Sequence, residues 1–286
     1  MNIETIKTFQ TLRTPFYYYD TTLLQATLQA ASQAAKEHGF NLHYAIKANA
    51  NPHILDIIQS HGIGADCVSG NEVVQAVASG FPPEKIVYAG VGKSDEEIRL
   101  ALEKEIFCFN CESLPEIEVI NILAGEMGEK APVALRVNPN VDAHTHHYIT
   151  TGIEENKFGF YLYDLDHAIT ACREMENINL IGLHFHIGSQ ITDLTVFRGL
   201  CLRVNEIQSR LKEQGIILPH VNFGGGLGIN YDCPTCGLIP DFASYFQTFA
   251  DFFEALPGQQ LHFELGRSLV GRFPHLSRPI REGRET

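Results

Sequence analysis

The stretch His43–Asn49 (HYAIKAN) places a lysine, Lys47, at the carboxyl end of a short apolar strand. Burying an unpaired ammonium group costs on the order of several kcal/mol. A lysine in such a place is therefore usually held by an anionic partner, or it reacts with a carbonyl group as the neutral amine. The alternative is a side chain that simply enters solvent where the strand ends. The stretch alone leaves these interpretations open.

Short apolar stretches of the same kind recur along the chain and alternate with helical ones. We expect strands at residues 42–47, 63–66, 86–89, 106–109, 133–138, 181–187, 220–223 and 261–264. Amphipathic helices are expected between most of them, at residues 53–60, 70–79, 95–103, 113–123, 165–175, 193–213 and 241–255. This alternation indicates parallel strands joined by right-handed crossovers. Eight strands favour an α/β fold of the (β/α)8 TIM-barrel type, with a doubly wound open sheet as the alternative.

Two further segments frame this pattern. Asp20 is predicted to cap a helix over residues 22–37, which Gly39 ends. Residues 139–163 form the one long predicted loop and are rich in His, Thr and Gly. A loop of that length within a compact domain is more typical of an active-site lid than of a linker.

The composition excludes several classes of protein. The 286 residues are 44% hydrophobic and 19% charged, which is ordinary for a soluble globular protein. A net charge of −13 argues against nucleic acid as a partner. No apolar run has the length of a membrane span, and the first residues lack the core of a signal peptide. We therefore expect a cytoplasmic protein without membrane contacts.

The seven cysteines are scattered and odd in number, so we expect reduced thiols rather than a disulfide framework. Cys233 and Cys236 form the one CxxC pair. Zinc would require two more ligands at a defined spacing, and no second CxxC exists. We interpret the pair as loop cysteines in preference to a metal or redox site, and we predict no metal.

A barrel carries its chemistry at the carboxyl ends of its strands. In this chain, charged or hydrogen-bonding residues, or a run of glycines, follow six of the eight predicted strands. They are Lys47, Asp66, Arg136, Asn138, His184, His186, Ser189, Gly224, Gly225, Gly226 and Glu264. Because these strand ends meet at one rim, packing alone does not account for them, and we predict a functional site.

Three turns on this rim suit a phosphate group. Gly224–Gly226 permits positive φ and close backbone approach, although a tight turn into a helix explains these glycines equally well. Ser189 adds a hydroxyl group, and Gly266–Arg267 adds a guanidinium group suited to anionic oxygens. Together with the amine of Lys47 they indicate a cofactor that carries both a phosphate and a carbonyl group. Pyridoxal 5'-phosphate meets both demands.

Four motifs resemble those of one known family. They are YAIKAN (44–49), RVNPNVDAHTHHYITTGIEENKFGF (136–160), HFHIGSQ (184–190) and NFGGGLGINY (222–231). Over residues 14–270 the chain resembles the diaminopimelate decarboxylases, which belong to the alanine-racemase-like, fold type III pyridoxal-phosphate enzymes. The resemblance implies decarboxylation of meso-2,6-diaminopimelate to L-lysine and CO2, the last step of lysine biosynthesis, by a homodimer.

The resemblance also implies roles for individual residues. Lys47 would form a Schiff base with the cofactor, His186 would stack on its ring, and Glu264 would pair with the pyridine nitrogen. The phosphate would be bound by Ser189, Gly224, Gly225, Gly226, Gly266 and Arg267. Arg267 would also bind the substrate carboxylate.

Asp66 and Arg136 are expected to lie behind the Schiff base, and a helix N-cap is an equal alternative for Asp66. Two other functions stay open. One is a decarboxylase of ornithine, arginine or carboxynorspermidine, and the other is a barrel that binds pyridoxal phosphate without catalysis.

The chain departs from the family in two places. The Glu-Pro-Gly-Arg of the family is Glu264–Arg267 (ELGR) here, which loses the φ restraint of proline. Family members also continue into a C-terminal β domain that supplies a catalytic cysteine and much of the dimer interface. Cys111–Ser113 matches that cysteine motif only as a helix start, so no catalytic cysteine is assigned.

We therefore divide the chain into three parts. Residues 21–270 form the cofactor-binding barrel, and residues 1–20 form an extended segment that would pair with the missing β domain. Residues 271–286 form an aberrant tail, for which a frameshift is our hypothesis; the downstream DNA sequence tests it. The aromatic strand within residues 15–20 would then be unpaired, which is an aggregation hazard, so we expect poor solubility or weak activity.

Overall fold

The computed structural model describes residues 3–141, 158–233, 236–272 and 274–277, and within them eight parallel strands close into a barrel. The strands are β2 (Asn41–Ala45), β3 (Gly64–Cys67), β4 (Ile86–Tyr88), β5 (Cys108–Cys111), β6 (Ala131–Arg136), β7 (Ile178–His184), β8 (His220–Asn222) and β9 (Gln260–Leu265). Each strand pairs with the next in the chain, and β9 pairs with β2. The predicted (β/α)8 barrel is confirmed, and the open-sheet alternative is wrong.

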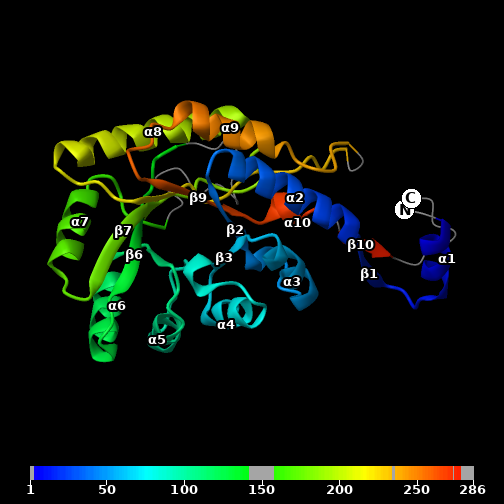
Figure 1. The fold of residues 1–286 in the computed structure, drawn as a ribbon, viewed down its shortest axis with the longest axis horizontal. Coiled ribbons are helices and arrows are strands. Elements are labelled where there is room, and N and C mark those ends of the chain that lie inside the picture. The colour runs from blue at the N-terminus through cyan, green and yellow to red at the C-terminus, as the bar shows by residue number, and fades with distance from the viewer. Residues whose placement is uncertain (1–2, 142–157, 234–235, 273, 278–286) are drawn as a thin grey trace, which may run out of the picture.

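A ring of helices surrounds the strands (Figure 1). It contains α2 (Thr21–Glu37), α3 (Pro52–Ser60), α4 (Gly70–Ala78), α5 (Asp95–Glu103), α6 (Leu114–Met127), α7 (Leu165–Glu174), α8 (Leu194–Glu213) and α9 (Phe242–Phe252). Among the described residues, the one helix that follows β9 is the four-residue α10 (Arg267–Val270). The last place in the ring is filled by α2, which packs beside α9 and α3. Asp20 caps α2 by accepting the N–H of Leu23, as predicted.

The eight strands end one to three residues from their predicted ends, and the differences at β2 and β5 affect the rim. β2 ends at Ala45, so Lys47 lies in a 3-10 turn over Ile46–Ala48 rather than in the strand. The turn keeps Ile46 buried while the chain leaves the barrel. β5 extends to Cys111 instead of ending at residue 109, because the polar Asn110 lies inside the barrel and is only 1% exposed.

The base of the barrel holds three histidines in a row, where aliphatic residues usually fill such barrels. The carbonyl of Lys85 accepts the Nδ1–H of His43 at 3.1 Å, so Nε2 of His43 is left as an acceptor. His262 donates to it from Nδ1 at 3.0 Å, and His220 donates from its Nδ1 to Nε2 of His262 at 3.1 Å. The ring of Phe107 stacks on His262. The carbonyl of Lys85 therefore determines which nitrogen carries the hydrogen in each of the three neutral rings.

The two ends of the chain form a small sheet beside the barrel (Figure 1). β1 (Phe16–Tyr19) pairs antiparallel with β10 (Pro274–Ser277). The expectation that the aromatic strand is unpaired is therefore wrong, since a tail segment forms its ladder. Residues 3–11 form α1 (Ile3–Thr11) instead of an extended segment, in keeping with apolar residues three apart in their sequence.

Cys233 and Cys236 are joined in a disulfide, and the other five cysteines are buried thiols. The prediction of reduced thiols is wrong for this pair, because the CxxC turn brings the two Cα atoms to 5.3 Å, within bonding range. Among the described residues, no helix combines the length and the apolar character needed to cross a membrane.

The histidine row predicts an acid-sensitive fold. Burial lowers the pKa of His43, His262 and His220 below the ordinary value of about 6.5. Below about pH 6.5 the unfolded chain therefore binds more protons than the folded chain. The free energy of unfolding is highest above about pH 6.5 and decreases as the pH falls below it. For His262 the loss between pH 7 and pH 5 is about 2 kcal/mol.

Urea unfolding at several pH values measures this effect. His262→Gln is expected to show a shallower loss of stability between pH 7 and pH 5 than the wild type. Phe107→Leu is the control, since it removes a packing partner but no titrating group, and it should lower stability equally at all pH values. If the free energy of unfolding fell equally with pH in His262→Gln and the wild type, the three histidines would not be buried in the neutral form.

Candidate active site

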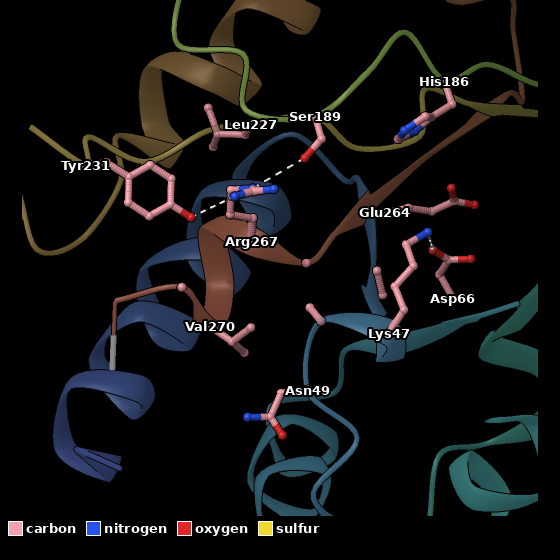
Figure 2. A pocket seen from close by; sticks show the side chains of 15 residues that line it. Lys47, Asn49, Asp66, His186, Ser189, Leu227, Tyr231, Glu264, Arg267 and Val270 are labelled. Atoms are coloured by element: carbon pink, nitrogen blue, oxygen red, sulfur yellow. Dashed lines mark hydrogen bonds and ion pairs between the residues drawn. The ribbon is translucent and has the colours of Figure 1, made fainter. Parts of the chain in front are cut away.

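A cavity of about 450 Å³ opens at the rim formed by the carboxyl ends of the strands. Eleven residues were expected to lie at or behind the cofactor, and eight of them line this cavity: Lys47, Asp66, His186, Ser189, Gly226, Glu264, Gly266 and Arg267. Figure 2 shows Arg267 and Ser189 on one side of the cavity and Glu264, Lys47 and Asp66 on the other. The structure thus brings together residues from the ends of β2, β3, β7, β8 and β9.

Lys47 and Asp66 form an ion pair in this cavity. Nζ of Lys47 lies 3.6 Å from Oδ2 of Asp66, and the lysine side chain is 55% exposed whereas the aspartate is 3% exposed. The charge of Asp66 raises the pKa of Lys47. Burial, with the charge of Glu264, raises the pKa of Asp66 to about 7 although Lys47 opposes this. Ser69, not Asp66, caps α4, so the N-cap alternative for Asp66 is wrong.

Glu264 is a buried carboxylate held by three donors. Oε1 accepts Nδ2 of Asn110 at 3.0 Å and Nδ2 of Asn222 at 2.7 Å. Oε2 lies 3.0 Å from Nε2 of His184. Burial alone would raise the pKa of Glu264, but the neighbouring His184 with its hydrogen bond, and the charge of Lys47, hold it below its usual range.

Two further groups that line the cavity are the guanidinium group of Arg267 and the imidazole of His186. Arg267 donates from Nε to Oγ of Ser189 at 3.4 Å and from Nη1 to the hydroxyl of Tyr231 at 2.7 Å (Figure 2). Burial lowers the pKa of His186 to about 3, so the ring is neutral. Its Nδ1 accepts the backbone N–H of Gly225 at 3.4 Å, which leaves the hydrogen on Nε2.

The glycine run Gly224–Gly226 contributes one residue to the cavity lining, and its main effect is on the packing of the backbone behind the cavity. Gly224 and Gly226 have φ of 66° and 116°, which favour glycine. The N–H groups of Gly224 and Gly225 already donate to Asn222 and His186, so only Gly226 lines the cavity. A Cβ atom on Gly225 would lie 2.0 Å from the backbone carbonyl oxygen of Glu264. The run therefore permits β8 and β9 to approach closely.

Arg136 does not line the cavity. Its Nη1 lies 2.5 Å from Oε1 of Glu112, and its guanidinium group lies over the ring of Phe158. Its charge lowers the pKa of Lys47, of Asp66 and of His186. The predicted lid over residues 139–163 falls largely on residues 142–157, which lie outside the described residues.

Sequence reasoning missed three residues of this site. Asn110 and Asn222 hold Glu264, and Tyr231 holds Arg267. His184 was placed on the rim without a role. A polar residue within a short apolar strand was the available signal for Asn110 and Asn222, since such a residue needs a buried partner.

The residues present fit pyridoxal 5'-phosphate. The hydroxyl of Ser189 and the guanidinium group of Arg267 supply donors for a phosphate, and the amine of Lys47 is available for a carbonyl group. Oδ1 of Asp66 is buried and has no hydrogen-bond partner in the described part of the chain. Three donors leave Glu264 one of its roughly four acceptor positions for a ring N–H.

The close approach at Gly225 predicts a strong effect of a single methyl group. Gly225→Ala is expected to lower the free energy of unfolding by roughly 1–3 kcal/mol or more, because backbone must move to admit the Cβ atom. Gly199→Ala in α8 is the matched control. Nothing lies within 4 Å of its Cβ, so it should stabilise the helix by up to about 1 kcal/mol. Urea unfolding of the cofactor-free chain measures both, and equal effects would contradict the described packing.

Comparison with known proteins identifies the family of the chain. The family described as "Pyridoxal-dependent decarboxylase, pyridoxal binding domain" matches residues 23–271. Diaminopimelate decarboxylase of Bacteroides thetaiotaomicron is 56% identical over 268 residues, which are 93% of this chain and 69% of that protein. The Aquifex aeolicus enzyme of the same name is 38% identical and matches 92% of this chain and 61% of its own length.

Solved structures give the same result. The crystal structure of diaminopimelate decarboxylase from Helicobacter pylori complexed with L-lysine superposes with a TM-score of 0.88 at 35% identity, covering 95% of this chain and 68% of that one. The M. jannaschii enzyme in co-complex with L-lysine gives 0.84 at 38% identity, covering 95% and 65%. The chain therefore belongs to the pyridoxal-dependent decarboxylases, and within them to the diaminopimelate decarboxylase family.

Proposed function

We propose that the chain is the pyridoxal-phosphate-binding barrel of a decarboxylase that converts meso-2,6-diaminopimelate to L-lysine and CO2. One observation carries this proposal: an amine, Lys47, lies beside the buried Asp66 in a cavity that also holds Glu264 and Arg267. The names of the relatives point to diaminopimelate, and two of the solved relatives contain L-lysine.

The cofactor, when bound, supplies a carbonyl group that condenses with amines and a ring that withdraws the electron pair left by departing CO2. Glu264 offers an ionised oxygen to the ring nitrogen, and His186 offers a neutral ring beside it. Arg267, already held by Ser189 and Tyr231, would bind an anionic group placed in the cavity.

Lys47 must lose a proton before its amine can react. Asp66 is suited to accept that proton, because its pKa of about 7 allows both protonation states near neutral pH and its Oδ1 has no partner in the described residues. Arg136 opposes the charge on Lys47 from behind the site. We therefore propose that Asp66 accepts the proton of Lys47 and that Arg136 favours its release. The sequence alone assigned these two residues no specific role.

From the family resemblance we also propose a homodimer in the cytoplasm. A measured molecular mass in solution equal to that of one chain would argue against the dimer.

Substitution of Lys47 tests the proposed function. Wild-type chain mixed with pyridoxal phosphate is expected to develop an absorbance band near the blue edge of the visible range and to release CO2 from diaminopimelate. Lys47→Ala should lose both, and Lys47→Arg should also lose both although it keeps the positive charge beside Asp66.

A panel of substrates separates the alternatives. Release of CO2 from ornithine, arginine or carboxynorspermidine in place of diaminopimelate would favour a polyamine-pathway decarboxylase. A band without CO2 release from any of them would indicate a barrel that binds the cofactor without catalysis. The absence of a band with Lys47 intact would overturn the proposal.

The acceptor role of Asp66 predicts a pH profile. The rate at which the cofactor-free chain develops the band should rise with pH through about 7, where Asp66 becomes ionised. Asp66→Asn should lose this inflection and react roughly 100-fold more slowly. Asp56→Asn, at an exposed position on α3, is the control and should keep the profile. An unchanged inflection in Asp66→Asn would exclude Asp66 as the acceptor.

A further inference from the structure

The donors that hold Glu264 come from three separate strands. Asn110 lies on β5, Asn222 on β8 and His184 on β7, and each is at most 5% exposed. The two amides share Oε1, and the imidazole contacts Oε2. A carboxylate can accept about four hydrogen bonds, so one position stays open, on Oε2. Closure of the barrel therefore prepares this carboxylate before any ligand arrives.

His184 differs from the two amides because an imidazole ring can carry its hydrogen on either of two nitrogen atoms. Its Nε2 faces Glu264, and its Nδ1 is buried without a hydrogen-bond partner in the part of the chain that the structure describes. A protonated ring would place an N–H at Nδ1 with no acceptor, which is costly in a buried site. In a neutral ring with its hydrogen on Nε2, Nδ1 is an acceptor without a donor, which costs less than a buried N–H without an acceptor. The surroundings therefore favour the neutral Nε2–H tautomer.

Rotation of this ring away from Glu264 is disfavoured by its place in the barrel. His184 is the last residue of β7, and it lies opposite Arg136 of β6 and Asn222 of β8 in the two adjoining ladders. Its side chain is 2% exposed. Rotation toward solvent would break the hydrogen bond to Glu264 and leave a cavity in the barrel. The donor is thus fixed in position.

We propose that His184 is a positioning residue that acts through Glu264: its neutral Nε2–H holds Oε2 so that the carboxylate stays ionised and directs its remaining lone pair into the cavity. Asn110 and Asn222 fix the other oxygen in the same way. That the lone pair meets a pyridine nitrogen rests on the proposed function. The holding of Glu264 does not, and it can be measured without cofactor.

The first test uses the wild-type, cofactor-free chain. The ¹⁵N shifts of His184, assigned by their loss in His184→Gln, should show a neutral ring with hydrogen on Nε2 at pH 7. An imidazolium ring, or hydrogen on Nδ1, would overturn the proposal. This measurement needs no unstable variant, and it stands even if the chain does not bind pyridoxal phosphate.

The second test removes the hydrogen bond. In His184→Phe the proton affinity of Glu264 should rise roughly 10- to 100-fold, as expected for the loss of one hydrogen bond to a charged group. The infrared carboxyl band of Glu264, assigned by its loss in Glu264→Gln, reports this shift. The dissociation constant for pyridoxal phosphate should rise by a similar factor. His184→Gln, which keeps an N–H near the position of Nε2, should restore both values toward wild type.

His220→Phe is the matched control, since it makes the same change at the base of the barrel without contact to Glu264. It should leave the Glu264 band unchanged. An unchanged band in His184→Phe would overturn the proposal. Equal behaviour of His184→Gln and His184→Phe would also overturn it, because the ring would then act through packing alone.

Discussion

The carboxylate of Glu264 lies inside the barrel, 7% exposed, and the polar groups around it follow from its charge. An isolated carboxylate could not be ionised there, because desolvation would outweigh any gain from the fold. Two amides and one imidazole replace its water, and they must come from other strands because neighbours on β9 point elsewhere. A closed barrel meets this demand, since it directs side chains from several strands toward one axis.

The same constraint shapes the backbone around the site. Glu264 can lie beside β8 only if the chain there has no Cβ atom at Gly225, whose missing methyl group would overlap the Glu264 carbonyl oxygen. Gly224 and Gly226 then adopt the positive φ values that turn the chain away. The glycine run thus serves the approach of two strands, and Gly226 is the member of the run that lines the cavity. Below this layer the neutral histidines fill the barrel with groups that satisfy one another.

Much of the architecture could be predicted from the sequence. The alternation of short apolar and amphipathic stretches gave eight strands in the correct order, because each parallel strand is buried on both faces. The rim residues from Lys47 to Arg267 followed from one rule about strand ends. Three features could not be predicted in this way. An apolar pattern excludes Asn110 from a strand, yet closure of the barrel gives that amide a buried partner.

The other two features depend on contacts distant in sequence. The pairing of β1 with β10 joins segments near the two ends of the chain, and no local pattern indicates it. The direction of Arg136 toward Glu112, away from the cavity, depends on the distance between β6 and the turn after β5. Strand-end position alone thus overestimates how many polar residues reach one cavity.

The central claim is that Lys47, among all lysines of the chain, is the amine that meets the cofactor. The base of the barrel offers a competing cavity of about 410 Å³ that is lined by Lys36 and Lys85. Borohydride reduction of the chain with bound pyridoxal phosphate, followed by mass spectrometry of its peptides, identifies the modified residue directly. We expect a single phosphopyridoxyl group on Lys47. A label on Lys36 or Lys85, or none on Lys47, would contradict it.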